Sequence, residues 1–175
     1  MMKILNIHGY GGSTQNSAYN TFTNMGYEVI SPALDYDNRS PEEILSELKS
    51  IIDSNGVKLI VGTSLGGFFS AVLSVRTGLP VILLNPCLMP FYHLPELGYN
   101  GDVKPFMALF GELSGIDTDK VSCIIGSEDE LISTHAFTKK LLENERFRII
   151  TGGKHSAFTL PLADYFSEIR PWFEI

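Results

Sequence analysis

One stretch of the sequence decides the fold: Lys58-Leu59-Ile60-Val61-Gly62-Thr63-Ser64-Leu65-Gly66-Gly67. Its first four residues have the composition of a buried strand, and the apolar run that follows the motif, Gly67 to Ser74, favours a helix. Between them the chain matches the pattern G-x-S-x-G, which places a serine on a sharp turn from strand to helix. Larger side chains in place of the two glycines would collide with neighbouring strands. The stretch therefore predicts an α/β fold with Ser64 as a nucleophile.

Working outward from Ser64, short apolar runs alternate with longer amphipathic or turn-rich segments. Near-continuous apolar runs are typical of parallel strands that are covered on both faces. The pattern predicts a three-layer α/β/α domain around a doubly wound, mostly parallel sheet of about six strands. The expected strands are Lys3 to Ile7, Tyr27 to Ile30, Lys58 to Gly62, Pro80 to Leu84, Val121 to Ile125 and Phe147 to Ile150.

The expected helices have clear ends. Ser40 is an N-cap followed by Pro41, and Gly56 ends that helix. The helix after Ser64 should stop at Gly78, and an aromatic stripe favours a last helix from Leu162 to Phe173 that packs on the core. One segment breaks the alternation. Residues 86–120 are rich in proline and aromatics, and we expect them to form a small lid with short helices of its own.

Length and composition favour one globular domain over residues 1–175, with 44% hydrophobic and 19% charged residues. A net charge of −7 opposes binding to nucleic acid, which requires clustered cations. No apolar run is long enough to span a bilayer. The expected partner is a small molecule, and the sequence leaves the oligomeric state open.

The two cysteines, Cys87 and Cys123, lie in apolar surroundings without the spacing of metal ligands. We interpret them as reduced core thiols, although the sequence alone does not exclude a disulfide between them. The apolar run within Met1 to His8 is too short for the core of a signal peptide, and it lacks a small-residue cleavage site. The expected location is cytoplasmic.

A nucleophilic serine needs a base, and the base needs a carboxylate that orients it. Among the histidines, His155 alone follows a late strand, within the glycine-containing loop 152–156. That loop should bring the ring to the carboxyl edge of the sheet, where ligands bind in open α/β sheets. The acid should follow the previous strand. We choose Asp129, with Glu128 as the alternative.

Two backbone N–H groups must stabilise the charge that develops on a substrate carbonyl. The expected donors are Leu65, directly after the nucleophile, and Tyr10, in the glycine-rich loop after the first strand. Tyr10 is also a candidate for the substrate pocket, together with Phe91, Tyr92 and His93 from the expected lid. Core packing explains those aromatics equally well.

The three other histidines have simpler interpretations. His8, at a strand end, should satisfy backbone groups and serve a structural role. His93 and His135 are expected at the surface, with His93 retained as a candidate for substrate contact.

The chain order of these motifs resembles the α/β-hydrolase superfamily: His8-Gly9, then the motif around Ser64, then Gly126 to Asp129, then Gly153 to His155. It is most similar to small bacterial esterases of the YqiA type. The resemblance implies a triad of Ser64, Asp129 and His155, hydrolysis of an ester or thioester, and no metal or organic cofactor. The first two strands of larger members are absent, so Lys3 to His8 corresponds to their third strand.

The leading hypothesis is a serine hydrolase of carboxylesterase or thioesterase type, in which Ser64 attacks the carbonyl, His155 takes its proton and water releases the acyl group. An alternative is a non-catalytic small-molecule-binding protein on a hydrolase scaffold. A third hypothesis treats the loop Gly9 to Gly12 as a nucleotide site, but position 14 is Thr where the dinucleotide pattern has glycine.

Overall fold

The structure, a computed structural model that describes residues 1–174, contains a single six-stranded sheet. The strands are ordered β2-β1-β3-β4-β5-β6, and all five neighbouring pairs are parallel. This confirms the predicted doubly wound sheet. The bounds are β1 Lys3–Ile7, β2 Glu28–Ile30, β3 Leu59–Thr63, β4 Val81–Leu84, β5 Val121–Gly126 and β6 Phe147–Ile150.

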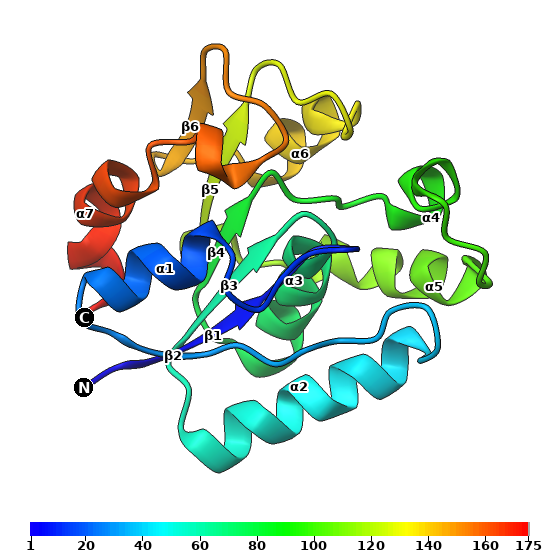
Figure 1. Ribbon diagram of the computed structural model, residues 1–175, viewed down its shortest axis with the longest axis horizontal. Coiled ribbons are helices and arrows are strands. Elements are labelled where there is room, and N and C mark those ends of the chain that lie inside the picture. The colour runs from blue at the N-terminus through cyan, green and yellow to red at the C-terminus, as the bar shows by residue number, and fades with distance from the viewer. Residues whose placement is uncertain (175) are drawn as a thin grey trace.

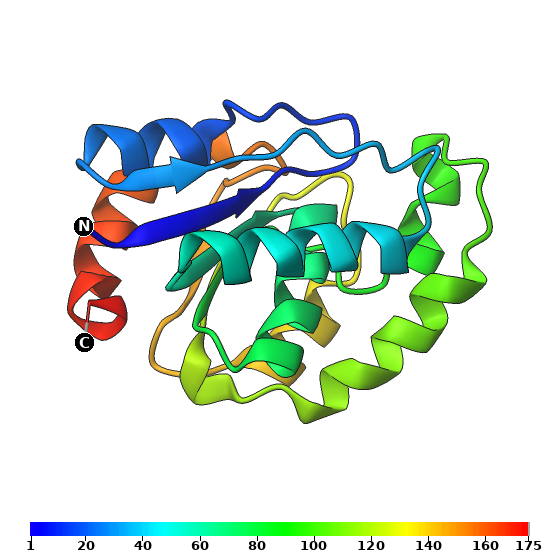
Figure 2. The same cartoon turned by 90° about the horizontal axis from the view of Figure 1, so that it is seen from below.

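Helices cover both faces of the sheet, so that the domain has three layers (Figure 1). Helices α1 and α7 pack side by side on one face, and α2, α3, α5 and α6 lie on the other (Figures 1 and 2). None of the helices within residues 1–174 is both long and apolar enough to cross a bilayer. The bounds are α1 Ser17–Asn24, α2 Pro41–Asn55, α3 Leu65–Thr77, α4 Pro90–His93, α5 Lys104–Glu112, α6 His135–Leu142 and α7 Leu162–Phe173.

Successive side chains of each strand enter different cores, because side chains alternate between the faces of a sheet. Ile4 of β1 belongs to the core under α1 and α7, and Leu5 to the core under α2, α3 and α5. In the first core Phe22 and Phe166 stack with their ring centroids 4.1 Å apart. Burying each of these rings stabilises the fold by about 2–3 kcal/mol. Apolar cores therefore hold the helices of both layers against the sheet.

Local signals end the helices where the sequence predicts. Ser40 and Glu43 form a reciprocal capping box at the start of α2. Gly56 and Gly78 close α2 and α3 in the left-handed conformation, with φ of 66° and 71°. Glycine adopts this conformation without steric cost. Both helices therefore end where the sequence predicts, and both pack against the same core.

The segment 86–120 contains the expected short helices: α4, α5 and three 3-10 turns, η1 Pro95–Leu97, η2 Leu113–Gly115 and η3 Thr118–Lys120. Much of it packs into the domain. Tyr99, Phe106 and Leu109 are buried in the core under α2 and α3. Within this segment α5 forms part of a helical layer and its aromatic rings serve packing, while the role of the segment as a small lid stays a prediction.

Because all strands are parallel, the loops that follow them meet at one edge of the sheet. Thr63 at the end of β3 pairs with Leu84 at the end of β4, and Gly126 ends β5 beside Ile150 of β6. The candidate catalytic residues follow these ends.

Candidate active site

Ser64 lies on the turn between β3 and α3, with φ 54° and ψ −118°. A serine in this region is strained by about 1–3 kcal/mol, and such a conformation persists only where neighbours hold it. Here the Ser64 N–H donates to the Leu84 carbonyl at 3.0 Å, and the Ser64 carbonyl accepts from the N–H groups of Gly67 and Cys87, both at 2.9 Å. The main chain of the serine is therefore fixed on both sides.

The flanking glycines are required by close backbone approach, as expected. A Cβ atom on Gly62 would lie 2.2 Å from Ser70 Oγ, and one on Gly66 would lie 2.0 Å from the Ile7 carbonyl oxygen. Real Cβ atoms essentially never approach non-bonded atoms this closely. Glycine at both positions lets α3 begin directly against β1, which places Ser64 at the edge of the sheet.

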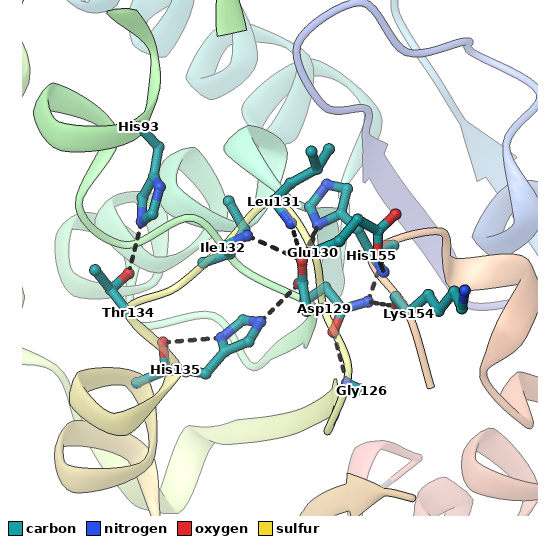
Figure 3. Close-up of polar contacts among 12 residues, drawn as sticks. His93, Gly126, Asp129, Glu130, Leu131, Ile132, Thr134, His135, Lys154 and His155 are labelled. Atoms are coloured by element: carbon teal, nitrogen blue, oxygen red, sulfur yellow. Dashed lines mark hydrogen bonds and ion pairs between the residues drawn. The ribbon is translucent and has the colours of Figure 1, made fainter. Parts of the chain in front are cut away.

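The Asp129 side chain is 1% exposed and lies in a dense set of hydrogen bonds (Figure 3). Its Oδ1 accepts from the N–H groups of Leu131 and Ile132 at 2.9 Å, and its Oδ2 accepts from His135 Nε2 at 2.8 Å. Burial alone would raise the pKa of Asp129, but hydrogen bonds from His135, His155 and Ile132 outweigh it and lower this pKa well below its usual range. The carboxylate is ionised at neutral pH.

His155 places its Nδ1 atom 3.0 Å from both carboxylate oxygens of Asp129. An ionised carboxylate only accepts hydrogen bonds, so Nδ1 carries the proton and Nε2 of the neutral ring has a free lone pair. Glu128, the alternative acid, is exposed, and its N–H donates to the Gly153 carbonyl at 2.8 Å. The carboxylate that meets the histidine is therefore that of Asp129.

His135 was expected at the surface, but its side chain is only 12% exposed and contacts Asp129. Its Nδ1 lies 3.4 Å from the hydroxyl of the buried Thr138. His135 begins α6 six residues after Asp129, and the loop between them turns the ring back toward the carboxylate (Figure 3). A histidine at a helix start carries no sequence signal for this contact, because the loop conformation creates it.

Ser64 and His155 line one cavity of about 370 Å³. Residues 1–174 show no direct hydrogen bond between the Ser64 hydroxyl and the ring, and catalytic hydrogen bonds often tighten only when substrate binds. No lining side chain is an aspartate, glutamate, lysine or arginine. The lining residues are Gly9, Tyr10, Gly11, Gly12, Ser13, Asn16, Thr63, Ser64, Leu97, Leu131, His155, Ser156 and Ala157.

Of the four predicted pocket residues, the structure brings only Tyr10 into this cavity. Phe91 packs edge to face on Phe110, with centroids 5.2 Å apart, and Tyr92 is 52% exposed. His93 is 1% exposed rather than at the surface, and its Nε2 lies 2.9 Å from the Thr134 hydroxyl. Burial lowers the pKa of His93. Phe91, Tyr92 and His93 are not among the residues that line this cavity, and their contact with substrate stays a prediction.

The loop after β1 lies against the nucleophile, since a Cβ atom on Gly9 would lie 3.0 Å from Ser64 Cβ. The N–H groups of Tyr10 and Leu65 donate no hydrogen bond within the described residues. The Tyr10 hydroxyl donates to Asp37 Oδ1 at 2.7 Å. Each of the two segments beside Ser64 therefore carries one backbone N–H group without an acceptor.

His8 has the structural role expected for it. Its Nε2 accepts from the Leu34 N–H at 3.0 Å, so its Nδ1 is the donor to the Gly9 carbonyl at 2.8 Å. The ring is 5% exposed and satisfies backbone groups.

As for metals, no group of three or more His, Cys, Asp or Glu within residues 1–174 is arranged to hold an ion.

Two kinds of known protein resemble this chain. Residues 3–108 match the sequence model of an uncharacterised protein family (UPF0227). Solved structures resemble it over nearly its whole length. A structure from a study of LipS and LipT, two metagenome-derived lipolytic enzymes, is 16% identical, with a TM-score of 0.69 over 97% of this chain and 94% of that chain.

Two further structures give the same result. One, from a study of carboxylesterases of the thaumarchaeon Nitrososphaera gargenis, is 15% identical, with a TM-score of 0.65 over 99% of this chain and 90% of that chain. The other, described as a predicted CIB-like hydrolase from Thermoplasma acidophilum, is 16% identical, with a TM-score of 0.63 over 99% and 87%. At these identities the comparisons establish the α/β-hydrolase fold.

Proposed function

The chain belongs to the uncharacterised protein family UPF0227 and has the α/β-hydrolase fold, and from this premise we propose that it is a serine hydrolase of small, uncharged esters or thioesters. One observation carries the proposal. A buried, ionised Asp129 holds the Nδ1–H of His155, and the same ring lines a cavity with the strained Ser64. These environments are the ones that the roles in a Ser-His-Asp triad require, which supports the proposal.

In the proposed reaction, Ser64 Oγ attacks the carbonyl carbon of the substrate while His155 Nε2 takes the hydroxyl proton. Asp129 keeps the ring in the correct tautomer and stabilises the imidazolium. The proton then passes from Nε2 to the leaving alcohol or thiol, and an acyl-enzyme remains. A water molecule, deprotonated by the same nitrogen, attacks the acyl carbonyl. The bond between Ser64 Oγ and the acyl carbon then breaks, Nε2 returns the proton to Oγ, and the carboxylic acid is released.

The negative charge of each tetrahedral intermediate would be stabilised by the N–H groups of Tyr10 and Leu65. Both amides are free of other acceptors in residues 1–174, and donors aimed in advance at a developing oxyanion are worth about 3–4 kcal/mol each. Because neither amide is bound elsewhere in residues 1–174, no hydrogen bond of theirs has to break when the charge appears.

The substrate class follows from the cavity. Its volume of about 370 Å³ is near the lower end for ligand sites. Its lining offers Leu97, Leu131 and Ala157 to apolar groups but no cation to pair with a carboxylate or phosphate. A net charge of −7 further opposes anionic substrates. We therefore expect short neutral acyl esters or thioesters.

The test is a chain-length series of acyl esters and thioesters, together with labelling by a fluorophosphonate probe. Ser64→Ala should abolish labelling and lower kcat by about 10⁴-fold or more, because it removes the nucleophile. Ser114→Ala, at an exposed serine of η2, serves as the control and should match the wild type. Folded wild-type protein without labelling, or a fully active Ser64→Ala, would contradict the proposal. Tight ligand binding without turnover would then favour the non-catalytic scaffold.

A further inference from the structure

Asn85 directly follows β4 and has a left-handed backbone with φ 42°. In residues 1–174 it shares a positive φ with only one other non-glycine residue, Ser64. Its side chain is fully buried. Asparagine tolerates this conformation better than most residues, but the strain persists only where surrounding contacts require it.

The Asn85 carboxamide uses all of its hydrogen-bonding groups on two neighbouring loops. Its Oδ1 accepts from the Gly126 N–H at 2.8 Å, at the end of β5. Its Nδ2 donates to the carbonyls of Lys154 and His155, at 2.8 and 2.9 Å. Gly126, Lys154 and His155 lie together in Figure 3. A buried amide that joins three backbone groups fixes their relative positions.

The same short segment also holds the nucleophile. The Leu84 carbonyl accepts the Ser64 N–H, and the Cys87 N–H donates to the Ser64 carbonyl. Residues 84–87 therefore hold the main chain of Ser64 on one side and that of His155 on the other. For the part of the chain that the structure describes, Asn85 makes the only hydrogen bonds between residues 84–87 and the loop 152–156.

Within the described residues, the other hydrogen bonds of His155 run to the loop of its acid and none runs to Ser64. The His155 N–H donates to Glu130 Oε2 at 3.0 Å, and its ring meets Asp129. Both carboxylates belong to the loop after β5. Without Asn85, the main chain of His155 would be held only by the loop that carries its acid, and it could shift away from Ser64 and change how the ring meets Asp129.

We propose that Asn85 is a positioning residue that sets the distance between Ser64 and His155 by holding the His155 main chain to the segment that holds the nucleophile. This inference rests on the proposed serine hydrolase function. Asn85 does not line the cavity, so it acts through His155 and not on the substrate. Its loss should lower kcat and leave KM nearly unchanged.

The kinetic test uses Asn85→Gly, which permits the same backbone conformation but removes the carboxamide. Asn144 provides a matched control, since its Nδ2 donates to the carbonyls of Thr118 and Val121 and its Oδ1 accepts from the Arg146 N–H, away from the cavity. Asn85→Gly should lower kcat about 10²-fold, the scale expected for a misplacement of about 1 Å. Asn144→Gly should keep kcat and KM within about twofold of the wild type.

A second measurement does not depend on turnover: the NMR signal of the His155 Nδ1–H proton bound to Asp129, assigned by its loss in His155→Gln. It should persist in Asn144→Gly and in Ser64→Ala, and shift or broaden by exchange in Asn85→Gly. Asn85→Asp, which keeps an acceptor for Gly126 but loses the donors to the His155 loop, should behave like Asn85→Gly.

The outcomes separate the two proposals. Equal activity of the wild type and Ser64→Ala would overturn the proposed function, and the NMR signal would still decide the role of Asn85. Unchanged kcat and an unchanged His155 signal in a folded Asn85 variant would overturn the positioning role. Failure of both Asn85 variants to fold while Asn144→Gly folds would also count against it, because Asn85 would then serve the fold.

Discussion

The two halves of the candidate site are built by different interactions. Around the nucleophile, β1, β3 and α3 approach so closely that only glycine fits at positions 62 and 66, and the amides of Tyr10 and Leu65 have no acceptor in residues 1–174. Around the acid, the backbone also approaches closely, since a Cβ atom on Gly126 would lie 2.2 Å from the Gly153 carbonyl oxygen, but here hydrogen-bond donors surround the carboxylate. Asp129 accepts from two histidines and two backbone amides.

This difference matches what each half has to do. The nucleophile half must receive a charge that arrives only with the reaction, so its donors are kept unpaired until then. The acid half must hold a charge that is always present, and a buried carboxylate is stable only when donors surround it. Variants that disturb packing and variants that disturb charge should therefore fail in different ways.

The largest effect is expected from Gly66→Ala, which disturbs the close packing of the nucleophile half. The added Cβ would lie 2.0 Å from the Ile7 carbonyl oxygen, in a central strand that cannot shift. The free energy of unfolding should fall by more than about 4 kcal/mol, as measured by urea denaturation. Gly111→Ala in α5, where a Cβ meets nothing within 4 Å, is the control and should stabilise by about 0.5–1 kcal/mol. A Gly66→Ala protein as stable as the wild type would refute the packing argument.

Asp129→Asn removes the negative charge of the acid half, and the fold should remain. The amide keeps the shape of the carboxylate but presents a donor to two histidines that also donate, so His155 loses its productive tautomer. We expect kcat for the best ester to fall about 10³- to 10⁴-fold with a native circular dichroism spectrum. Asp53→Asn, on the exposed face of α2, is the matched control. Wild-type turnover in Asp129→Asn would exclude Asp129 from the triad.

The same variant should change how stability depends on pH. The pKa of Asp129 is lowered on folding, so its ionised form stabilises the protein at neutral pH, and this contribution is lost as pH falls below the unfolded value of about 3.9. The difference in unfolding free energy between wild type and Asp129→Asn should therefore be largest near pH 7 and shrink below about pH 4. Urea denaturation at a series of pH values measures it, and a difference that widens toward acid would show the opposite sign of linkage.

The smallest effect is expected from His135→Phe, which removes one of the four donors to Asp129. Hydrogen bonds to charged groups contribute about 1.5–3 kcal/mol, so the free energy of unfolding should fall by that amount. Because His155 and the two amides still hold the carboxylate, kcat should fall less than about tenfold. His135→Gln, which restores a donor, should recover part of the lost stability. A loss of kcat as large as that of Asp129→Asn would mean that both histidines are equally required.

Much of the fold could be predicted because buried parallel strands appear as short apolar runs bounded by glycine and proline. β1 and β6 have the predicted bounds, and α7 spans the predicted range Leu162–Phe173. The nucleophile half could also be predicted, because close backbone approach requires glycine and the motif around Ser64 contains glycine at those positions. Parallel strands then brought Asp129 and His155 to the same edge.

The hydrogen-bond partners of the acid half could not be predicted in the same way. Asn85 meets its partners 41 to 70 residues further along the chain, and no periodic pattern encodes such contacts. His135 was assigned to the surface because the bend of its loop is a tertiary property. For the pocket, the aromatic content of residues 86–120 did not indicate which rings face Ser64, and α4 directs Phe91 into packing.

One contact of the nucleophile has a practical consequence for chemical probes. Cys87, whose amide holds the Ser64 carbonyl, has a buried thiol, and burial followed by the nearby charge of Asp129 raises its pKa to about 12. The thiol therefore stays protonated at neutral pH, whereas the thiolate is the reactive form. Alkylating agents and mild oxidants should therefore spare this position, and any covalent adduct formed beside the cavity would report the serine and not the cysteine.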